Sequence, residues 1–234
     1  MNSVADAAGQ AFGLVAAADP KLVDIVLRSL RVSLSAVLIG CLIGLPLGAV
    51  IAVNEFRGRR ALIVTLNGLM GLPSVVVGLA VYLLLSRAGP LGAWGILFTP
   101  TAMVIAQSIL ITPTIAALSR QVVSDAWQEY REQLRSLGES KLGAVPTLLW
   151  DLRFSLMTIV LAGFGRAASE VGAVMIVGGN IDGVTRVMTT SIALETSKGD
   201  LPLALGLGFI LLFIVLALNA GAYLVKEMAQ RRYG

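Results

Sequence analysis

Residues 32–53 read VSLSAVLIGCLIGLPLGAVIAV, a run of 22 residues without one charged side chain. The hydrocarbon core of a bilayer is about 30 Å thick, and about 20 apolar residues in an α-helix cross it. The run is long enough and apolar enough to span a membrane. It predicts an integral membrane protein.

Four further stretches of the 234-residue chain have the same apolar character. They cover residues 61–85, 101–118, 154–177 and 201–225. Backbone polar groups inside a bilayer have to be paired within the protein, and an α-helix pairs them within one segment. The sequence therefore predicts an all-α integral membrane protein, a single domain over residues 1–234 with five transmembrane helices.

The composition agrees with membrane insertion and excludes several kinds of site. Apolar residues make up 56% of the chain and charged residues 14%, whereas soluble domains carry about 25% charged residues. The chain has no His and one Cys, so it lacks the usual zinc and haem ligands and the base of a Ser-His-Asp triad. We expect no metal site, no cofactor and no catalytic residue.

Lys and Arg are distributed unequally between the spans. The loops after the first and third spans and the C-terminal tail hold eleven of them, and the remaining extramembrane segments hold six. Positively charged loops stay in the cytoplasm. This predicts an N-terminus outside and a C-terminus in the cytoplasm, and it explains the net charge of +4 without a nucleic-acid partner.

The segment just before the first span repeats apolar residues at helical spacing. These residues are Leu22, Ile25, Val26 and Leu30, and charged residues lie between them. The pattern predicts a short amphipathic helix that lies at the membrane interface and leads into the first span.

Within the first span, Gly40, Gly44 and Gly48 recur at every fourth residue. Such a stripe lets two helix backbones approach closely. It predicts either packing within this chain or a contact between two copies, and packing within the chain is favoured.

Prolines interrupt the second and third predicted spans at Pro73 and Pro113. Proline removes a helical hydrogen bond and kinks a helix. Inside a membrane, a break persists where neighbouring helices or a cavity pair the freed carbonyls. Each proline therefore indicates either a tolerated kink or an element that moves or lines a pathway.

Residues 120–153 form a 34-residue loop on the predicted cytoplasmic side. Its residues Trp127, Tyr130, Leu134 and Leu137 lie at spacings of 3, 4 and 3, which places them on one helix face. Gly138 follows, where a left-handed residue would end the helix. The apolar face needs a cover, either the cytoplasmic surface of the bundle itself or a groove on a soluble partner.

The same loop carries a recognisable pattern. Its residues 132–138 read EQLRSLG and resemble the E-A-A-x-x-x-G signature of the membrane subunits of ABC importers, although Gln133 and Leu134 replace the two alanines. The resemblance implies a cytoplasmic coupling helix that docks into a separate ATPase subunit. The residues that it implicates in ATPase coupling are Glu132, Leu134, Ser136, Leu137 and Gly138.

Later blocks narrow the resemblance. Residues 169–173 (SEVGA) and 180–186 (NIDGVTR) resemble the E-x-G-A and N-I-x-G-x-T-R run of molybdate- and tungstate-type permeases, and residues 193–200 (ALETSKGD) are most similar to the tungstate branch. The implied fold is that of a type I ABC importer permease, with five transmembrane helices, an interfacial N-terminal helix and a cytoplasmic coupling helix. The implied function is to form the translocation pathway for an oxyanion, tungstate or alternatively molybdate or a sulfate-like oxyanion.

The resemblance also implies the partners and the membrane. They are a second copy of the chain, two ABC ATPase subunits, an extracytoplasmic oxyanion-binding protein and the lipid bilayer of the inner membrane. The sequence itself contains no G-x-x-x-x-G-K-[ST] motif and no Gly-Lys dipeptide, so it lacks the phosphate-binding loop for ATP. We expect a transport subunit that is not an enzyme, with ATP hydrolysis in a partner.

Two ionisable residues, Arg166 and Glu170, lie four positions apart in the fourth predicted span and would share one helix face. Ionisable groups inside a membrane face the protein interior and find partners. The two either form an internal ion pair that holds the packing or, with Pro73, line or gate the translocation path.

The external segment after the fourth span carries an amide, a hydroxyl and a guanidinium at Asn180, Thr185 and Arg186. Such groups suit an oxyanion at the outer mouth. Contact with the binding protein, or capping of a short helix that begins near Gly183, would use the same residues. We favour capping and contact with the binding protein.

Two other function classes fit the sequence less well. A self-sufficient secondary transporter commonly contains internal repeats, and neither a duplication nor an even number of spans is found here. An intramembrane enzyme would need a nucleophile and a base, and the predicted spans contain Arg166 and Glu170 as their one ionisable pair, with no His.

Overall fold

The computed structural model describes residues 13, 17 and 19–233, and the other residues of the predicted domain 1–234 lie outside the described part. The regular structure of the described residues is helical. Its elements are α2 (Pro20–Val53), α3 (Arg59–Met70), α4 (Ser74–Leu85), the 3-10 turn η1 (Gly92–Trp94), α5 (Pro100–Ser136), α6 (Ala144–Asp151), α7 (Arg153–Ala168), α8 (Gly172–Gly178), α9 (Met188–Lys198) and α10 (Leu201–Tyr233).

Three described helices are long and apolar enough to cross a membrane: α2, α5 and the Leu201–Gly221 part of α10. Two bent pairs pass the same test together, α3 with α4 at 99° and α6 with α7 at 76°. The predicted count of five is therefore reached only if each bent pair is one span. The all-helical membrane class is confirmed, and the picture of five simple helices is not.

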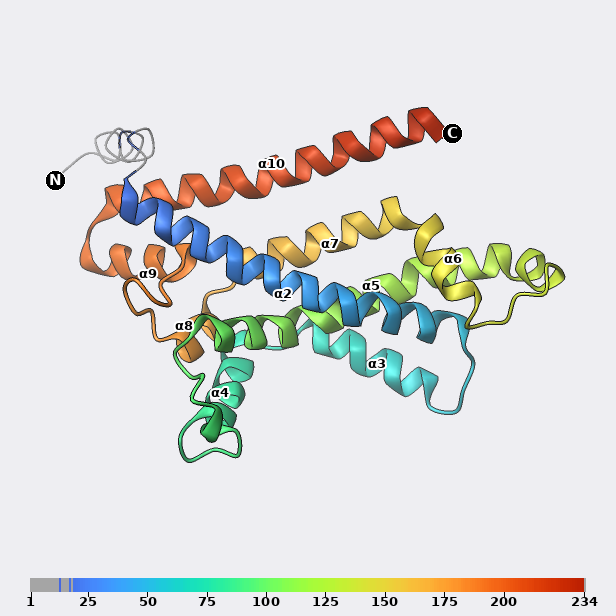
Figure 1. The fold of residues 1–234 in the computed structure, drawn as a ribbon, viewed down its shortest axis with the longest axis horizontal. Helices are drawn as coiled ribbons and strands as arrows, with labels where there is room; N and C mark the ends of the chain where they lie inside the picture. The colour runs from blue at the N-terminus through green and yellow to red at the C-terminus, as the bar shows by residue number, and fades with distance from the viewer. Residues whose placement is uncertain (1–12, 14–16, 18, 234) are drawn as a thin grey trace.

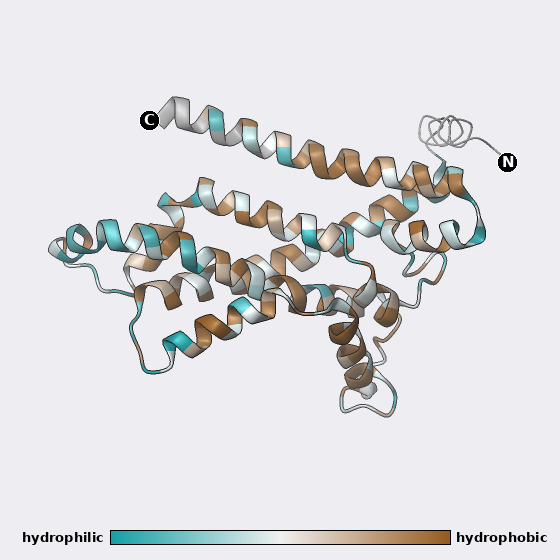
Figure 2. Ribbon diagram, turned by 180° about the vertical axis from the view of Figure 1, so that it is seen from behind, coloured by the Kyte–Doolittle hydropathy of each residue, from teal (hydrophilic) through white to brown (hydrophobic). Residues whose placement is uncertain are grey.

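Successive segments alternate in direction along the long axis of the molecule (Figure 1). The helices α2, α5 and α10 run toward the end that carries α6, and α3 and α7 run back toward the end that carries α9. We call these the α6 end and the α9 end. Figure 2 shows apolar residues along the middle of the helices and hydrophilic residues gathered near the α6 end.

The helices α2 and α5 form the centre of the bundle through a close backbone approach. A Cβ atom added at Gly44 would lie 3.0 Å from the Thr112 carbonyl oxygen, and one at Gly48 would lie 2.4 Å from the Ala116 carbonyl oxygen. The Ser119 hydroxyl donates to the Leu45 carbonyl across the same contact, at 3.2 Å. The glycine stripe therefore serves packing within this chain, the favoured alternative.

The predicted interfacial helix is not a separate element. Residues 21–31 form the first turns of α2, which begins at Pro20, with the Asp19 carboxylate accepting from the backbone N–H of Lys21 at 2.9 Å. Leu22 and Ile25 are buried in one cluster with residues of α9 and α10. These residues are helical and lead into the first span, as predicted, but they form one continuous helix with it because no residue breaks the helix before position 32.

The second predicted span, 61–85, is also not one helix. It is divided into α3 and α4 by Gly71, Leu72 and Pro73, and Pro73 is the N-cap of α4 with extended backbone angles. The third predicted span, 101–118, lies within α5, which continues through Pro113 to Ser136 without a break. Pro73 therefore lies at a break between two helices, and Pro113 lies inside one helix.

The fourth predicted span, 154–177, is wrong as a continuous helix. The helix α7 ends at Ala168, and α8 begins at Gly172 after the break at residues 169–171. The apolar composition of residues 154–177 does not predict this break. Hydropathy measures how favourably a segment inserts into lipid, and it does not measure whether the backbone is one continuous helix.

Candidate functional site

Two breaks in the predicted spans bring two short helices together. We call residues 71–73 and 169–171 the paired breaks, and the helices that follow them are α4 and α8. A Cβ atom at Gly78 of α4 would lie 2.7 Å from the Cα of Ala173 in α8, and one at Gly172 would lie 2.8 Å from a methyl of Val75. The two helices therefore touch almost backbone to backbone.

Side chains of other helices bond backbone carbonyls near the second break. The Gln107 amide donates to the Ala167 carbonyl at 3.0 Å, and the Thr189 hydroxyl donates to the Glu170 carbonyl at 2.8 Å. Glu170 in turn accepts from the backbone N–H of Ala173 at 3.1 Å. Irregular backbone at membrane depth is tolerated where protein groups pair it. Gln107 and Thr189 are site residues that sequence reasoning missed, since neither lies in the span that they support.

Arg166 and Glu170 do not share a continuous helix. Arg166 lies in the last turn of α7, whereas Glu170 lies in the break and holds the first turn of α8. The ion pairs of the described residues join Asp24 to Arg28, Asp182 to Arg186 and Glu195 to Lys198. The expected internal pair between Arg166 and Glu170 is thus not formed, and the buried Nε of Arg166 has no hydrogen-bond partner among the described residues.

At the α9 end, the three predicted outer residues lie in the loop between α8 and α9, residues 179–187. Thr185 is 1% exposed and its hydroxyl donates to the Gly178 carbonyl, so it shapes the loop from inside. The Asn180 amide donates to the Thr190 carbonyl at 3.4 Å, and Arg186 pairs with Asp182 at 3.1 Å. The helix expected near Gly183 begins at Met188 instead.

At the α6 end, the helix α5 extends far into the predicted loop 120–153 and ends at Ser136. Gly138 has a φ of +86°. The Glu139 N–H bonds the Leu134 carbonyl and the Gly138 N–H bonds the Arg135 carbonyl, both at 3.0 Å. This is the Schellman helix end that the position of Gly138 predicts. Glu132 and Ser136 are exposed on the last turns of α5.

The predicted apolar stripe is divided between two environments. Trp127, Tyr130 and Leu134 pack in one cluster with residues of α2 and α6, so the bundle itself covers them. The remaining member, Leu137, is 74% exposed. Leu142 and Trp150, which the stripe did not include, are 61% and 71% exposed. We call Leu137, Leu142 and Trp150 the loop surface.

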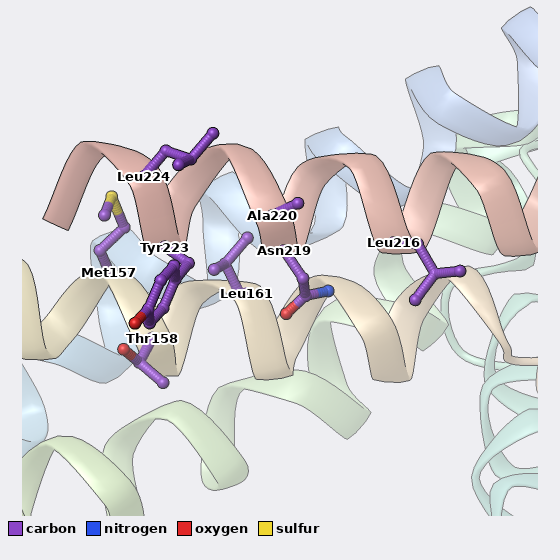
Figure 3. Close-up of a pocket in the computed structure, with 8 residues that line it drawn as sticks. All are labelled: Met157, Thr158, Leu161, Leu216, Asn219, Ala220, Tyr223 and Leu224. Atoms are coloured by element: carbon purple, nitrogen blue, oxygen red, sulfur yellow. The ribbon is translucent and has the colours of Figure 1, made fainter. Parts of the chain in front are cut away.

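Two cavities mark different parts of the molecule. One of about 240 Å³ lies beside the loop surface, between the end of α5 and α6, and Leu134, Leu137 and Asp151 are among its lining residues. The other, an open groove of about 690 Å³, lies between α7 and α10 (Figure 3). Its lining residues are Met157, Thr158, Leu161, Leu216, Asn219, Ala220, Tyr223 and Leu224.

The groove between α7 and α10 lies at the periphery of the bundle. Only 17% of the apolar window of α10 is buried, against 61% for α5. No predicted site residue lines the groove, so its size does not make it the candidate site. Among the described residues, no group of three or more His, Cys, Asp or Glu side chains is placed to hold a metal ion.

Comparison with known proteins places this geometry in context. Residues 44–234 match the protein family described as "Binding-protein-dependent transport system inner membrane component". The chain is 42% identical over 227 residues to the tungstate uptake system permease protein TupB of Peptoclostridium acidaminophilum, covering 97% of this chain and 100% of that protein.

Two further relatives are similar over much of their length. A probable anion ABC transporter permease protein of Haloferax volcanii is 40% identical over 91% of this chain and 94% of that protein. The TupB protein of Campylobacter jejuni is 37% identical over 74% of this chain and 72% of that protein. Sulfate and molybdenum transport permeases also match, at 26–29% identity.

Proposed function

Because this chain belongs to the family of inner-membrane components of binding-protein-dependent transport systems, we propose that it is the transmembrane subunit of an ATP-driven importer whose cargo is tungstate. Two relatives are named as tungstate permeases and are more similar to this chain than the sulfate and molybdenum permeases are. That order of similarity supports tungstate over molybdate.

The loop surface is the observation that carries the ATP-driven part of the proposal. Leu137, Leu142 and Trp150 are apolar and more than half exposed. Leu137 lies in the importer signature at residues 132–138, and the other two follow it within residues 120–153. The chain has no phosphate-binding loop of its own. Two copies of the chain, as one transmembrane domain each, would therefore pair with two ATPase subunits that cover this surface, with the α6 end in the cytoplasm and the α9 end outside.

The paired breaks are the proposed gate. Pro73 begins α4, and Arg166 and Glu170 lie on either side of the entry to the second break. An oxyanion path needs positive potential, and Arg166 supplies it because no carboxylate of the described residues forms an ion pair with it. The short helices α4 and α8 would move together when the ATPases close, since their backbones touch at Gly78 and Ala173.

The loop between α8 and α9 is the proposed outer contact. With the α9 end outside, Asn180 and Arg186 would face the protein that delivers the oxyanion, while the buried Thr185 holds the loop in shape.

The first experiment is to extract the tagged chain gently from native membranes and determine the mass of the intact complex. We expect two copies with two ATPase subunits, and ATP-dependent tungstate uptake once the complex and its binding protein are placed in vesicles. A chain that emerges alone in several mild detergents would overturn the ATPase partnership. Uptake of molybdate without tungstate would overturn the cargo.

The gate is tested separately with Arg166→Gln. We expect the complex to assemble and the uptake rate to fall at least tenfold, because a path that lacks its unpaired positive charge attracts a dianion less well. The matched variant Arg31→Gln removes an exposed arginine of α2 and should leave uptake unchanged. Equal uptake by both variants would remove Arg166 from the path.

A further inference from the structure

A single arginine of the first helix holds the loop that follows the second break. The Arg28 guanidinium donates to the Gly183 carbonyl at 2.8 Å and to the Arg186 carbonyl at 3.3 Å. It also pairs with the Asp24 carboxylate, one turn earlier on α2, at 2.6 Å. The Arg28 side chain is 14% exposed, and its bond to the Arg186 carbonyl is partly buried.

The loop needs such an anchor because its backbone is unusual. Gly179, Asn180 and Gly183 all have positive φ, and Asn180 at +50° is one of two described residues other than Gly with that conformation. Left-handed conformations cost energy for side-chain-bearing residues and persist when the surroundings fix them.

The loop is also a compact turn. The N–H groups of Val184, Thr185 and Arg186 all point to the Ile181 carbonyl, at 2.9 to 3.2 Å. The carbonyls of Gly183 and Arg186 point away from this turn, toward Arg28. A planar guanidinium presents several N–H donors in a fixed fork, so one side chain reaches both carbonyls and a carboxylate. Lysine has a single ammonium and cannot reproduce that fork.

The anchored loop forms one wall of a polar cavity. The cavity has a volume of about 390 Å³ and lies at the α9 end, between the start of α2, the loop and the helices α9 and α10. Asp182 and Arg186 line it together with Lys21, Glu195 and Lys198. Arg28 thus bonds the backbone of the segment that carries the Asp182–Arg186 pair.

We propose that Arg28 is a positioning residue, which holds residues 179–187 in the shape that the oxyanion-delivering protein recognises. Arg28 acts through two carbonyls and contacts neither the cargo nor the gate. This inference rests on the proposed function for the identity of the partner. The anchoring of the loop by Arg28 is a property of the chain alone.

The test compares Arg28→Gln, Arg28→Lys and the control Arg31→Gln, which alters an exposed arginine of the same helix. In the complex with its ATPase, Arg28→Gln should raise the binding-protein concentration for half-maximal ATPase stimulation about tenfold and leave the maximal rate unchanged. Arg28→Lys should be intermediate, and Arg31→Gln should match the unaltered chain. A general loss of structure would lower the maximal rate instead, and an unchanged half-maximal concentration for Arg28→Gln would overturn the inference.

A second measurement separates this inference from the proposed function. In the complex without binding protein, hydrogen exchange at the amides of Val184, Thr185 and Arg186 should accelerate at least tenfold in Arg28→Gln. Equal exchange in both proteins would show that Arg28 does not anchor the loop. If the unaltered complex is not stimulated by any binding protein but the exchange result holds, the proposed function fails and the anchor stands.

Discussion

The paired breaks and the loop surface depart from simple helix geometry in opposite ways. At the second break, side chains of other helices bond the backbone: the Gln107 amide donates to the Ala167 carbonyl, which also accepts the Glu170 N–H, and the Thr189 hydroxyl donates to the Glu170 carbonyl. At the loop surface, the backbone is closed by an ordinary Schellman turn, yet three large apolar side chains remain exposed. In the first region, side chains of the same chain bond the irregular backbone, whereas in the second region large apolar side chains are left without cover.

The two regions show that a departure from a simple buried helix can have two different causes. An unpaired backbone group inside a membrane is so costly that it is paired wherever the fold allows. Exposing an apolar side chain outside the membrane costs less free energy than leaving a backbone group unpaired inside it. Such a side chain can be covered by a partner protein, as in helices that insert into a groove. Backbone carbonyls that side chains of the same chain bond therefore indicate an internal element, such as the proposed gate. Large apolar side chains that the chain itself leaves exposed indicate an interface with another protein.

The largest effect is expected from a substitution in the loop surface. Leu137→Glu places a charge in the proposed ATPase contact, where a central apolar residue contributes about 2 kcal/mol or more to binding, or about 30-fold in affinity. We expect the ATPase subunit to be lost on purification and tungstate uptake to fall at least 30-fold. The thermal stability of the isolated chain should stay unchanged, because the Leu137 side chain is mostly exposed.

The matched control for Leu137→Glu is Arg131→Ala, at an exposed position of α5 near the same end. It should retain the ATPase. If Leu137→Glu also retains it, the loop surface is covered by something else and the comparison fails on that side.

An intermediate effect is expected from a substitution that tests how closely α4 and α8 pack at the paired breaks. Gly78→Ala would place a Cβ 2.7 Å from the Cα of Ala173, and overpacking of this kind costs about 1–3 kcal/mol. We expect a lower melting temperature for the purified chain in detergent.

Gly68→Ala provides the contrast, since a Cβ at Gly68 of α3 would meet nothing within 4 Å. Replacing a helical glycine by alanine in open space should raise stability by about 0.5–1 kcal/mol. Equal melting temperatures for the two variants would show that α4 and α8 do not pack as closely as the structure indicates.

The smallest expected effect concerns the polar pairing of the second break. Gln107→Leu removes the side-chain donor to the Ala167 carbonyl, and interhelical hydrogen bonds in membrane proteins contribute about 1 kcal/mol. The neighbouring Ser108→Ala should have almost no effect on the melting temperature, because the buried Ser108 hydroxyl has no partner among the described residues. A larger loss for Ser108→Ala than for Gln107→Leu would contradict the assignment of Gln107.

Sequence reasoning succeeded where the property belongs to a local segment. The apolar runs identified membrane helices, Gly138 identified the end of α5, and residues 132–138 and 169–200 identified the importer family. In each case the prediction depends only on residues that are neighbours in the sequence. An apolar run predicts a membrane helix, and a glycine predicts a left-handed helix end.

Prolines were a poor guide to the breaks. Pro73 is the N-cap of α4, two residues after the Gly71 C-cap of α3, whereas Pro113 lies within an unbroken α5. The break at residues 169–171 contains no proline at all. The second break is stabilised by residues that are distant in the sequence. No local pattern predicts that Gln107 and Thr189 will bond the carbonyls near this break.

The sequence by itself determined that this is an all-helical membrane protein of the importer permease family, because hydropathy and short motifs are written along the chain. Only the tertiary structure decided that the glycine stripe packs on α5 and that Arg166 and Glu170 form no ion pair with each other. It also decided that the apolar stripe is partly covered and partly exposed, and that Arg28 holds a loop 155 residues away. Each of these depends on which segments become neighbours in space, and that is set by the packing of the whole bundle.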